Sequence, residues 1–304
     1  MTEVTIVGTG AMALFVGGRL SRGGIKVRLL GTWEDSINAI NQKGICFVDG
    51  DSGEFYPAEA SLDPEGLRGS RLALVLVKSW QTERAARQLA GFLAEEGIAL
   101  SLQNGLGHGE ILKASLRQER AALGVTTYGA TCLGPGMVRP GGEGVISVQE
   151  HPRLPLLLEA LQAGGFTVRE IPDLSGLVWG KLVINVAINP LTAILGVKNG
   201  ALVESPAAAR LMGEAAREAA DVAGELGVPL DFKDPAQAAE AVATATAENL
   251  SSMLQDINRG APTEIEAMCG EVVRLGTDLG VPTPVNELLS LLIKSKVDLS
   301  RKEE

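Results

Sequence analysis

The residues of this sequence that could do chemistry are concentrated in one short stretch, residues 179–190. Lys181, Asn185 and Asn189 follow one another at intervals of four residues, so on a helix they would form one polar stripe. The rest of the stretch is apolar or glycine. A lysine in such surroundings must pair, reach solvent or lower its pKa, because a buried unpaired ammonium is costly.

Two interpretations of this stripe stay open. It could be a solvated helix face, although such faces usually carry Glu, Gln and Arg, which are better helix formers than Asn. Alternatively, one cation and two amides, each amide able to donate and accept, suit a carbonyl or hydroxyl ligand. We therefore treat the stripe as a candidate catalytic face. Pro190 lacks an N–H and is predicted to kink or end the helix beside Asn189.

The composition limits what kind of protein carries this stripe. A chain of 304 residues suggests two domains, and 45% apolar with 21% charged residues is ordinary for a globular protein. The net charge of −10 argues against non-specific binding to nucleic acid or an anionic membrane, but it permits one phosphate-bearing cofactor. No uninterrupted apolar run reaches membrane-spanning length, and two histidines make a His-based metal site or a Ser-His-Asp hydrolase improbable. We expect no metal.

The cysteines indicate the compartment. Cys46, Cys132 and Cys269 are far apart, without a Cys-x-x-Cys pair, and there is no secretory signal. These features predict a reduced, cytoplasmic setting.

The amino-terminal segment predicts a dinucleotide-binding turn. A β-branched strand at residues 4–7 leads into Gly-x-Gly-x-x-Ala, a helix follows, and a second strand occupies residues 26–30. In this context the first Gly permits the tight turn, the second lets backbone approach a pyrophosphate, and the Ala fills the third position. The free N–H groups of the helix would bind the phosphates. The alternative is a purely structural turn. The residues concerned are Gly8, Thr9, Gly10, Ala11, Met12 and Ala13.

The end of the second strand normally selects the cofactor. An acidic residue there binds the ribose 2′-hydroxyl of NAD, whereas an Arg accommodates the 2′-phosphate of NADP. This chain has Gly31 and Thr32 at that position, and Arg28 lies within the strand. The residues therefore leave the choice between the two cofactors open.

Polar residues follow two further strands. Residues 72–77 and 98–102 are continuous apolar runs, typical of buried parallel strands, and they end at Lys78 and at Gln103-Asn104-Gly105. Ligands of open α/β sheets bind beyond the carboxyl ends of the strands. Lys78 could be a surface lysine and Asn104 a turn residue. Together with the glycine turn, they favour one shared ligand.

The remaining pattern divides the chain near residue 172. Strands are predicted at residues 121–125 and 144–148, around a turn-rich run, as antiparallel additions to the sheet edge. A helix at 152–164 and a strand at 166–170 complete a domain of residues 1–172. From residue 173 to 304 only helical patterns remain, including one helix at 238–258. Thr263 is predicted to cap the next helix, with Glu266 completing a capping box; Glu264 would be either a first-turn acid or a functional group.

Jointly these features resemble the ketopantoate reductase (2-dehydropantoate 2-reductase) family over essentially the whole chain. The glycine turn is generic, whereas the Lys-x-x-x-Asn-x-x-x-Asn stripe combined with the later motifs is much more specific. The motifs are Gly8 to Ala13, Lys78-Ser79-Trp80-Gln81, Gln103-Asn104-Gly105, the Lys181/Asn185/Asn189 stripe, Asn199-Gly200, Ser251-Ser252-Met253-Leu254-Gln255-Asp256 and Thr263-Glu264-Ile265.

The resemblance implies an α/β fold with an N-terminal Rossmann-type doubly wound sheet, an all-helical C-terminal domain and an active site in the cleft between them. It implies reduction of 2-dehydropantoate to (R)-pantoate with NADPH, in pantothenate and hence coenzyme A biosynthesis. Lys181 would be the general acid. The substrate would contact Asn104, Lys181, Asn185, Asn189, Asn199, Ser252, Met253, Leu254 and Gln255. Besides the residues of the glycine turn, Lys78, Asn104, Ala130 and Glu264 would line the cofactor.

One departure from the family concerns the cofactor. Family members often carry Arg at the end of the second strand, where this chain has Gly31 and Thr32. The resemblance makes NADP(H) the expected cofactor, and the absence of this Arg makes NAD(H) the alternative.

Two rival functions are kept. The nearer rival is a dehydrogenase of the same architecture acting on another 2-oxo or 3-hydroxy acid. The more distant one is a non-catalytic dinucleotide-sensing protein, against which the complete set of polar site residues argues. The expected partner is a small 2-oxo acid, with no nucleic acid or membrane, and the chain is expected to be a monomer or a homodimer.

Overall fold

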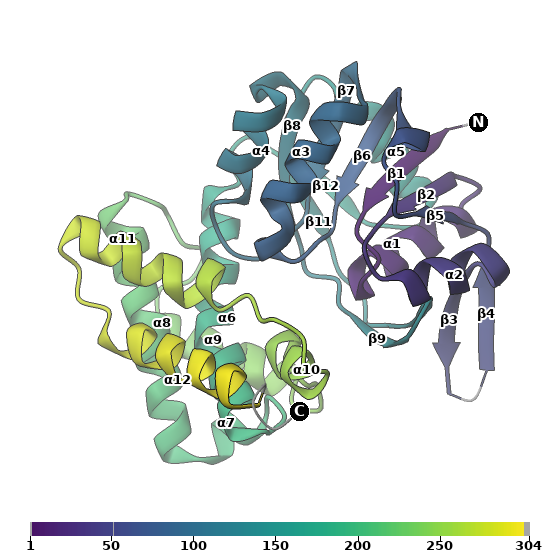
Figure 1. Cartoon of the computed structure of the whole chain (residues 1–304). Helices are drawn as coiled ribbons and strands as arrows, with labels where there is room; N and C mark the ends of the chain where they lie inside the picture. Colours follow the sequence, from purple (N-terminus) through teal and green to yellow (C-terminus); the bar gives the residue numbers. More distant parts are fainter. Residues whose placement is uncertain (1, 51, 301–304) are drawn as a thin grey trace. The chain divides into compact units, whose positions relative to one another are not determined.

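The computed structural model describes residues 2–50 and 52–300. The chain divides into two compact units (Figure 1). The first runs from the start of the described chain to Gln103 and then over Gly107–Leu174. The second comprises Asn104–Leu106 and the chain from Ser175 onward. The short loop Asn104–Leu106 thus packs with the second unit, although its neighbours in sequence belong to the first.

The first unit is built on an eight-stranded sheet of order β12-β11-β8-β7-β6-β1-β2-β5. All neighbouring strands are parallel except β8 and β11. The strands are β1 Glu3–Val7, β2 Lys26–Leu30, β5 Glu59–Ser61, β6 Ser70–Val75, β7 Leu93–Ser101, β8 Ala121–Thr126, β11 Ile146–Gln149 and β12 Val168–Ile171.

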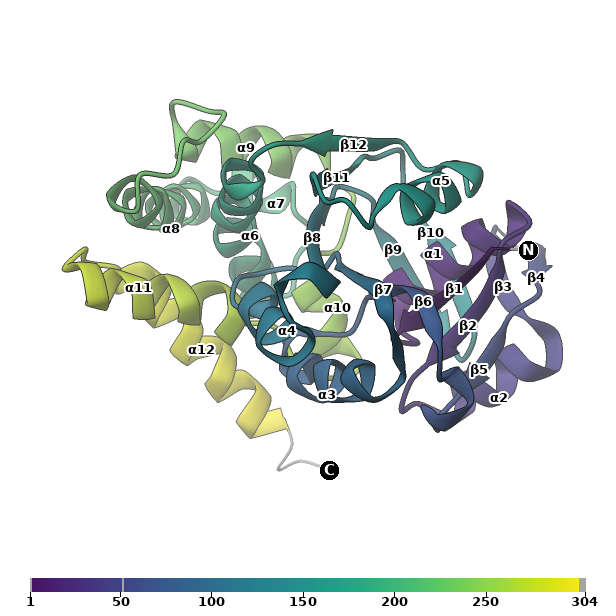
Figure 2. The ribbon, with the colours of Figure 1, turned by 90° about the horizontal axis from the view of Figure 1, so that it is seen from above.

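Helices cover both faces of this sheet (Figure 2). In the central strand β6, Leu72 and Leu74 pack in the core formed with α1 (Ala11–Arg22) and α5 (Pro155–Ala163). Ala73 and Val75 face the opposite core, which includes α3 (Thr82–Phe92) and α4 (His108–Leu116). Both faces of β6 are buried, which explains its uninterrupted apolar sequence. This arrangement confirms the predicted doubly wound α/β fold.

The shorter elements of the first unit lie around this framework. They are helix α2 (Glu34–Lys43) and the 3₁₀ turns Glu65–Leu67, Ser79–Gln81 and Gln118–Arg120.

A second, four-stranded sheet of order β4-β3-β10-β9 was not predicted. It comprises β3 (Ile45–Asp49), β4 (Ser52–Tyr56), β9 (Ala130–Gly134) and β10 (Met137–Pro140). The predicted antiparallel addition to the main sheet is right only for β11, because β8 is parallel to β7 and the chain between β8 and β11 leaves the main sheet. The pairing of β10 with β3 joins segments distant in sequence, for which no local pattern exists.

The second unit is helical throughout its described part. Its elements are α6 Ser175–Leu195, α7 Ala201–Glu204, α8 Pro206–Glu225, α9 Pro235–Ala245, α10 Ser252–Asn258, a π-helical turn Glu266–Gly270, α11 Glu271–Leu279 and α12 Pro284–Ser300.

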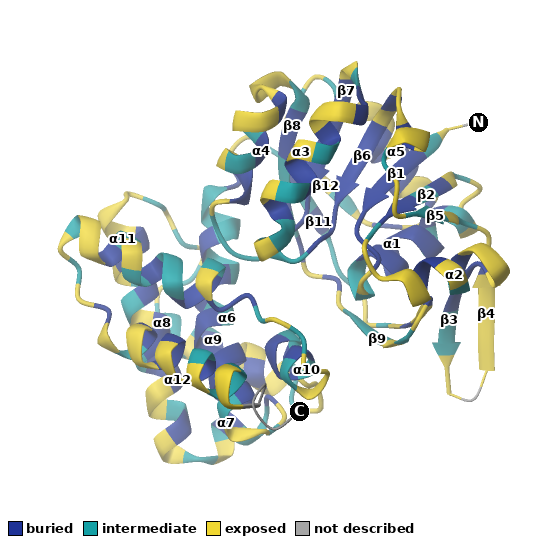
Figure 3. Cartoon of the chain, viewed as in Figure 1, coloured by how far each residue is buried: buried dark blue, intermediate teal, exposed yellow. Residues whose placement is uncertain are grey.

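Helix α6 is the core of this unit. It packs against α8, α9, α10 and α12 and is buried over much of its length (Figure 3). By length and composition alone, α6 could cross a bilayer. The search for uninterrupted apolar runs in the sequence had not identified it. In the structure most of this helix is buried inside the protein. Its apolar sequence is accounted for by this burial.

Three local predictions in the second unit are wrong in whole or in part. Pro190 does not end helix α6, which continues to Leu195, since tertiary packing around the buried proline outweighs the lost backbone hydrogen bond. A kink at Pro190 stays a prediction. The helix predicted at 238–258 is broken between α9 and α10, where the Ser251 hydroxyl accepts from the Leu254 N–H (3.1 Å) and starts a new helix.

The third concerns the capping box. Thr263 does not cap a helix; instead the Gly270 N–H donates to the Ile265 carbonyl (3.0 Å) in a π-helical turn. Glu266 forms an ion pair with Lys294 of α12 (2.5 Å) and does not reach back to Thr263. Glu266 therefore pairs with a residue distant in sequence, in place of the predicted local partner Thr263.

Candidate active site

The glycine turn has the geometry that its sequence predicts. Gly8 has φ +137° and donates its N–H to the Leu30 carbonyl (2.7 Å). A Cβ at Gly8 would lie 2.9 Å from the Leu76 carbonyl oxygen, so only glycine fits. Gly10 is exposed at the start of α1, and a Cβ there would meet nothing within 4 Å. The helix N-terminus is thus open to an anion.

The other residues of the turn support it. Ala13 is fully buried in the core under α1, Thr9 is buried, and Ala11 and Met12 are half-buried.

The end of β2 is packed against this turn. A Cβ at Gly31 would lie 2.4 Å from Cγ2 and 2.5 Å from Oγ1 of Thr9. The Gly31 N–H donates to the Ser61 carbonyl (3.1 Å), which fixes the backbone there. A larger residue therefore cannot replace Gly31 unless Thr9 moves.

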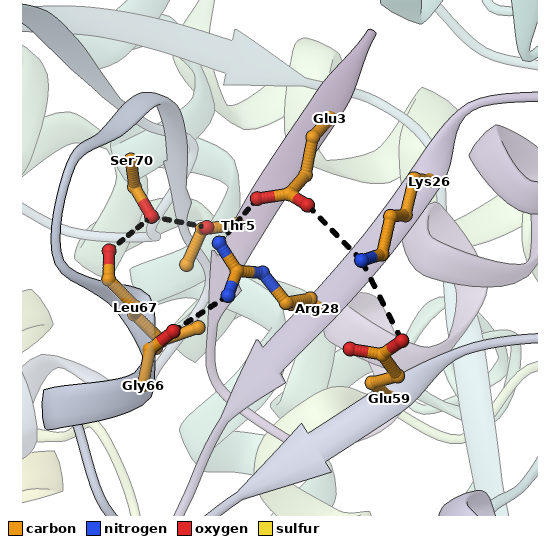
Figure 4. A network of polar contacts seen from close by, with 8 residues as sticks. All are labelled: Glu3, Thr5, Lys26, Arg28, Glu59, Gly66, Leu67 and Ser70. Carbon is orange, nitrogen blue, oxygen red and sulfur yellow. Dashed lines mark hydrogen bonds and ion pairs between the residues drawn. The ribbon is translucent and has the colours of Figure 1, made fainter. Parts of the chain in front are cut away.

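Arg28 is engaged away from the cofactor-selecting position. Its guanidinium bonds the Glu3 carboxylate and donates to the Gly66 carbonyl (2.6 Å), as Figure 4 shows. Glu3 is the first residue of β1, so Arg28 is held toward the amino ends of the strands. The same carboxylate pairs with Lys26 (3.4 Å), whose second partner is Glu59 (3.6 Å). This network stabilises the sheet. Because it engages the Arg28 guanidinium, Arg28 is not available to bind a 2′-phosphate.

The other predicted cofactor residues follow neighbouring strands. In the order β7-β6-β1, Lys78 comes shortly after β6 and Asn104 shortly after β7, and both are half-buried. The carboxyl ends of these three parallel strands lie side by side, which places Lys78 at the same edge of the sheet as the glycine turn. Ala130 is the half-buried first residue of β9, in the small sheet.

The loop after Asn104 is anchored within the helical unit. The Leu106 N–H donates to the Ala267 carbonyl (3.1 Å). Gly105, with φ +83°, approaches the same carbonyl so closely that a Cβ would lie 2.4 Å from its oxygen. The chain carrying Asn104 is therefore fixed to the π-helical turn that follows Glu264.

Lys181 has the electrostatics of a proton donor. The residue is half-buried, and removal of water from around its ammonium lowers the pKa from 10.5 to about 8. The buried carboxylate of Glu264 opposes this shift and raises the pKa. The direction of the net shift agrees with the apolar sequence of α6.

The stripe differs in exposure along its length. Asn185 is half-buried, while Asn189 is buried with its Nδ2 3.9 Å from the Met268 sulfur. The interpretation of the stripe as a water-facing surface is therefore wrong for Asn189, and it stays open for the partly exposed Lys181 and Asn185.

Asn199 contains a buried acceptor without a partner. Its Nδ2 donates to the Thr246 hydroxyl (2.9 Å), and its backbone N–H donates to the Asn249 carbonyl (3.1 Å). Its Oδ1 is buried and has no hydrogen-bond partner among the residues that the structure describes. Such an atom suits a ligand hydroxyl or amine, because a buried acceptor left unpaired is costly.

Residues 252–255 lie on α10, where two of their side chains are half-buried and two are buried in the core. Ser252 and Gln255 are half-buried, and the Gln255 amide donates to the Leu250 carbonyl (3.0 Å). Met253 and Leu254 have their side chains in the core of the helical unit, so their side chains do not offer a surface to substrate.

Three buried residues inside the motifs were not predicted to have a site role. Ser251 starts α10 and its hydroxyl lies 2.7 Å from that of Thr192 on α6. Gln103 is buried in a polar network at the end of β7, and buried Asp256 pairs with Arg259 (2.8 Å). All three lie inside the motifs that resemble the family, and this position was the sequence signal that could have identified them. The expectation that both sets of site residues meet in a cleft between the domains stays a prediction.

Two family models match the chain. The model for ketopantoate reductase PanE/ApbA matches residues 4–153, and that for ketopantoate reductase PanE/ApbA C terminal matches residues 173–297. The chain belongs to the ketopantoate reductase family. Members of this family are oxidoreductases that use a nicotinamide dinucleotide and a small keto acid, and this chain is an enzyme of that type.

Named relatives agree with this assignment. A 2-dehydropantoate 2-reductase of Halobacterium salinarum is 34% identical over 299 residues, covering 96% of this chain and 98% of the relative. One of Archaeoglobus fulgidus is 34% identical over 298 residues, covering 96% and 97%.

Solved structures also match. A PanE/ApbA family ketopantoate reductase from Ralstonia eutropha has a TM-score of 0.91 at 32% identity, covering 99% of this chain and all (100%) of that chain. D-mandelate dehydrogenase with NADH and anilino(oxo)acetate has a TM-score of 0.91 at 24% identity, covering 98% and 99%, and so shares the fold of this ketopantoate reductase family member.

Proposed function

We propose that this ketopantoate reductase family member reduces 2-dehydropantoate to (R)-pantoate, with Lys181 as the general acid. One observation carries the proposal: the Lys181 ammonium is desolvated in an apolar helix, and its pKa is about 8. A donor with a pKa near the working pH can be protonated and still release its proton readily. The reaction would place the protein in pantothenate and hence coenzyme A biosynthesis.

The chemistry needs a proton at one atom. When bound, the nicotinamide supplies a hydride to the ketone carbon, and negative charge develops on the ketone oxygen. Lys181 would donate its proton to that oxygen and become a neutral amine. Glu264 would keep enough of the lysine protonated, since its charge raises the lysine pKa. Such acid catalysis is worth roughly 10²–10⁴-fold.

Amide groups would orient the substrate. The Oδ1 of Asn199, which has no partner in the described part of the chain, can accept a hydrogen bond from a hydroxyl of the substrate, which 2-dehydropantoate provides. Asn185 would add a donor from the face of α6 that also carries Lys181. Asn104, Asn189, Ser252 and Gln255 are the remaining proposed contacts, with the backbone of Met253 and Leu254.

The glycine turn fits a dinucleotide, and the end of β2 offers no cation to an extra phosphate. Gly8 and Gly10 form the tight turn and the open helix start that a pyrophosphate requires. Arg28 is bound to Glu3, and the next charged residues after Gly31 are acidic, Glu34 and Asp35. We infer that NADPH is accepted with little preference over NADH.

The function is tested by absorbance at the nicotinamide band, with ketopantoate and with NADPH or NADH in separate reactions. We expect turnover with both cofactors and kcat/KM values within about tenfold of each other, because the charge-assisted contact that would favour NADPH, worth roughly 1.5–3 kcal/mol or about 10–150-fold, is missing at the end of β2. Smaller 2-oxo acids and 3-hydroxy acids form the comparison panel. Preference for another acid would replace the proposed substrate, and dinucleotide binding without turnover on any acid would favour the sensing protein.

The pH dependence tests the role of the Lys181–Glu264 pair. Reduction requires the ammonium, so kcat/KM should be level below pH 8 and fall about tenfold per unit at higher pH. Glu264→Gln removes the charge that raises the lysine pKa, so the fall should begin at a lower pH. Initial rates over pH 5.5–10 measure both profiles. An unchanged profile in Glu264→Gln would contradict the pairing.

A further inference from the structure

We propose that Gln103 is a positioning residue for the dinucleotide side of the site. Its buried amide holds the turn that carries Lys78 against the end of β7, directly before Asn104. This inference rests on the proposed function and adds to it a residue that need not touch either reactant.

One end of the Gln103 amide spans the Lys78 turn. Its Nε2 donates to the Val77 carbonyl (2.9 Å) and to the Thr82 hydroxyl (2.8 Å). Val77 directly precedes Lys78, and Thr82 is the first residue of α3, so the two acceptors flank the turn. Both hydrogens of the amide are used.

The turn is also closed internally. The Gln81 N–H donates to the Lys78 carbonyl (2.8 Å), and the Thr82 hydroxyl donates to the Ser79 carbonyl (2.7 Å). The Thr82 hydroxyl thus accepts from Gln103 while it donates within the turn. Movement of the Gln103 amide would therefore be transmitted to the backbone of Lys78.

The other end of the amide is held by two more buried groups. The Ser101 hydroxyl donates to the Gln103 Oε1 (3.0 Å), and its oxygen lies 3.0 Å from Nδ1 of His108, the first residue of α4. Because serine has one hydrogen and Gln103 receives it, we infer that His108 carries its hydrogen on Nδ1 and donates to Ser101.

The amide can have only one orientation. The Val77 carbonyl accepts hydrogen bonds and cannot donate them, so Nε2 must face it and Oε1 must face Ser101. Ser101, Gln103, His108 and Thr82 are all at least nine-tenths buried. Buried polar networks that are fully paired rigidify the elements they join. Here they join the ends of β6 and β7, and Lys78 and Asn104 each follow an anchored residue.

Gln103→Glu is the central test. The change keeps the shape of the side chain but places an acceptor oxygen against the Val77 carbonyl. We expect the Kd for NADPH or NADH to rise about tenfold and kcat/KM to fall roughly 10–100-fold, because small displacements of positioned groups have effects of this size. Gln118→Glu, at an exposed glutamine of the same domain, makes the same chemical change and should leave both values unaltered.

A milder pair of variants protects the test against loss of folding. Thr82→Val removes one of the two acceptors with little change in volume, and it should weaken dinucleotide binding in the same direction as Gln103→Glu. Thr82→Ser keeps the hydroxyl and should restore the wild-type Kd. Circular dichroism and the Tm establish the folded fraction of each variant.

The readouts separate positioning from simple stability. Nucleotide fluorescence measures Kd without substrate, so it remains informative even if the wild type fails to reduce ketopantoate and the proposed function falls. If the Tm drops in Gln103→Glu and Thr82→Val while Kd and kcat per folded molecule stay at wild-type values, the network is structural only and the inference is overturned. A wild type that binds neither nucleotide would overturn both proposals.

Discussion

Lys181→Met is expected to lower kcat for ketopantoate reduction by roughly 10²–10⁴-fold, the usual contribution of a positioned general acid. Methionine fills a volume close to that of the lysine stem and suits the apolar surroundings of α6, so the helix should stay folded. The dinucleotide turn lies on other elements, and Kd for NADPH or NADH should remain within about threefold. Steady-state kinetics measures kcat, and nucleotide fluorescence measures Kd.

Lys233→Met is the matched control. Lys233 is an exposed lysine of the same unit, in the connection before α9, and its loss should not change kcat. Addition of small primary amines to Lys181→Ala offers a second check, because alanine leaves the space of the lysine side chain open and an amine diffusing into it could return part of the acid function. Near-wild-type turnover in Lys181→Met would remove Lys181 from the mechanism.

Gly105→Ala is expected to lower kcat/KM by about 100-fold, because displacing a substrate-positioning loop by about 1 Å has effects of this size. The backbone at Gly105 has φ +83°, which a residue with a Cβ adopts at a cost of roughly 1–2 kcal/mol. In addition, the new Cβ would lie 2.4 Å from the Ala267 oxygen and 3.0 Å from its carbonyl carbon. The loop must move away from the π-helical turn and take Asn104 with it.

Gly107→Ala isolates the steric part of this effect. Gly107 has the same φ of +83°, yet a Cβ there would meet nothing within 4 Å. It should therefore show the backbone cost alone, as a lower Tm with kcat/KM within a few-fold of wild type. Equal losses of kcat/KM in both variants would show that the contact with Ala267 does not position the loop.

The features that could be predicted from sequence are those set by neighbouring residues. The glycine turn and the buried strand β6 follow from local pattern and steric demand, and they suffice for the doubly wound fold. The period of the helix placed Lys181 with Asn185, and its apolar setting indicated the direction of its pKa shift. The roles of these residues in catalysis stay predictions.

The features that escaped prediction depend on distant partners. The small sheet requires β10 to pair with β3, and the π-helical turn has Glu266 bonded to Lys294 in place of Thr263. Gln103 carried no local signal of a positioning role, because its three partners, Ser101, Val77 and Thr82, are brought to it only by the fold. The Oδ1 of Asn199 lacks a partner within residues 2–50 and 52–300, and this too depends on its surroundings and is not revealed by any spacing in the sequence.

The tight packing of Thr9 against Gly31 constrains how cofactor specificity could evolve or be redesigned. An arginine introduced at position 31 alone would collide with the buried Thr9 of the glycine turn, so we expect that this first step towards stronger NADPH selection would weaken binding of either nucleotide. A smaller residue at position 9 must come first. The two positions therefore have to change together and in this order.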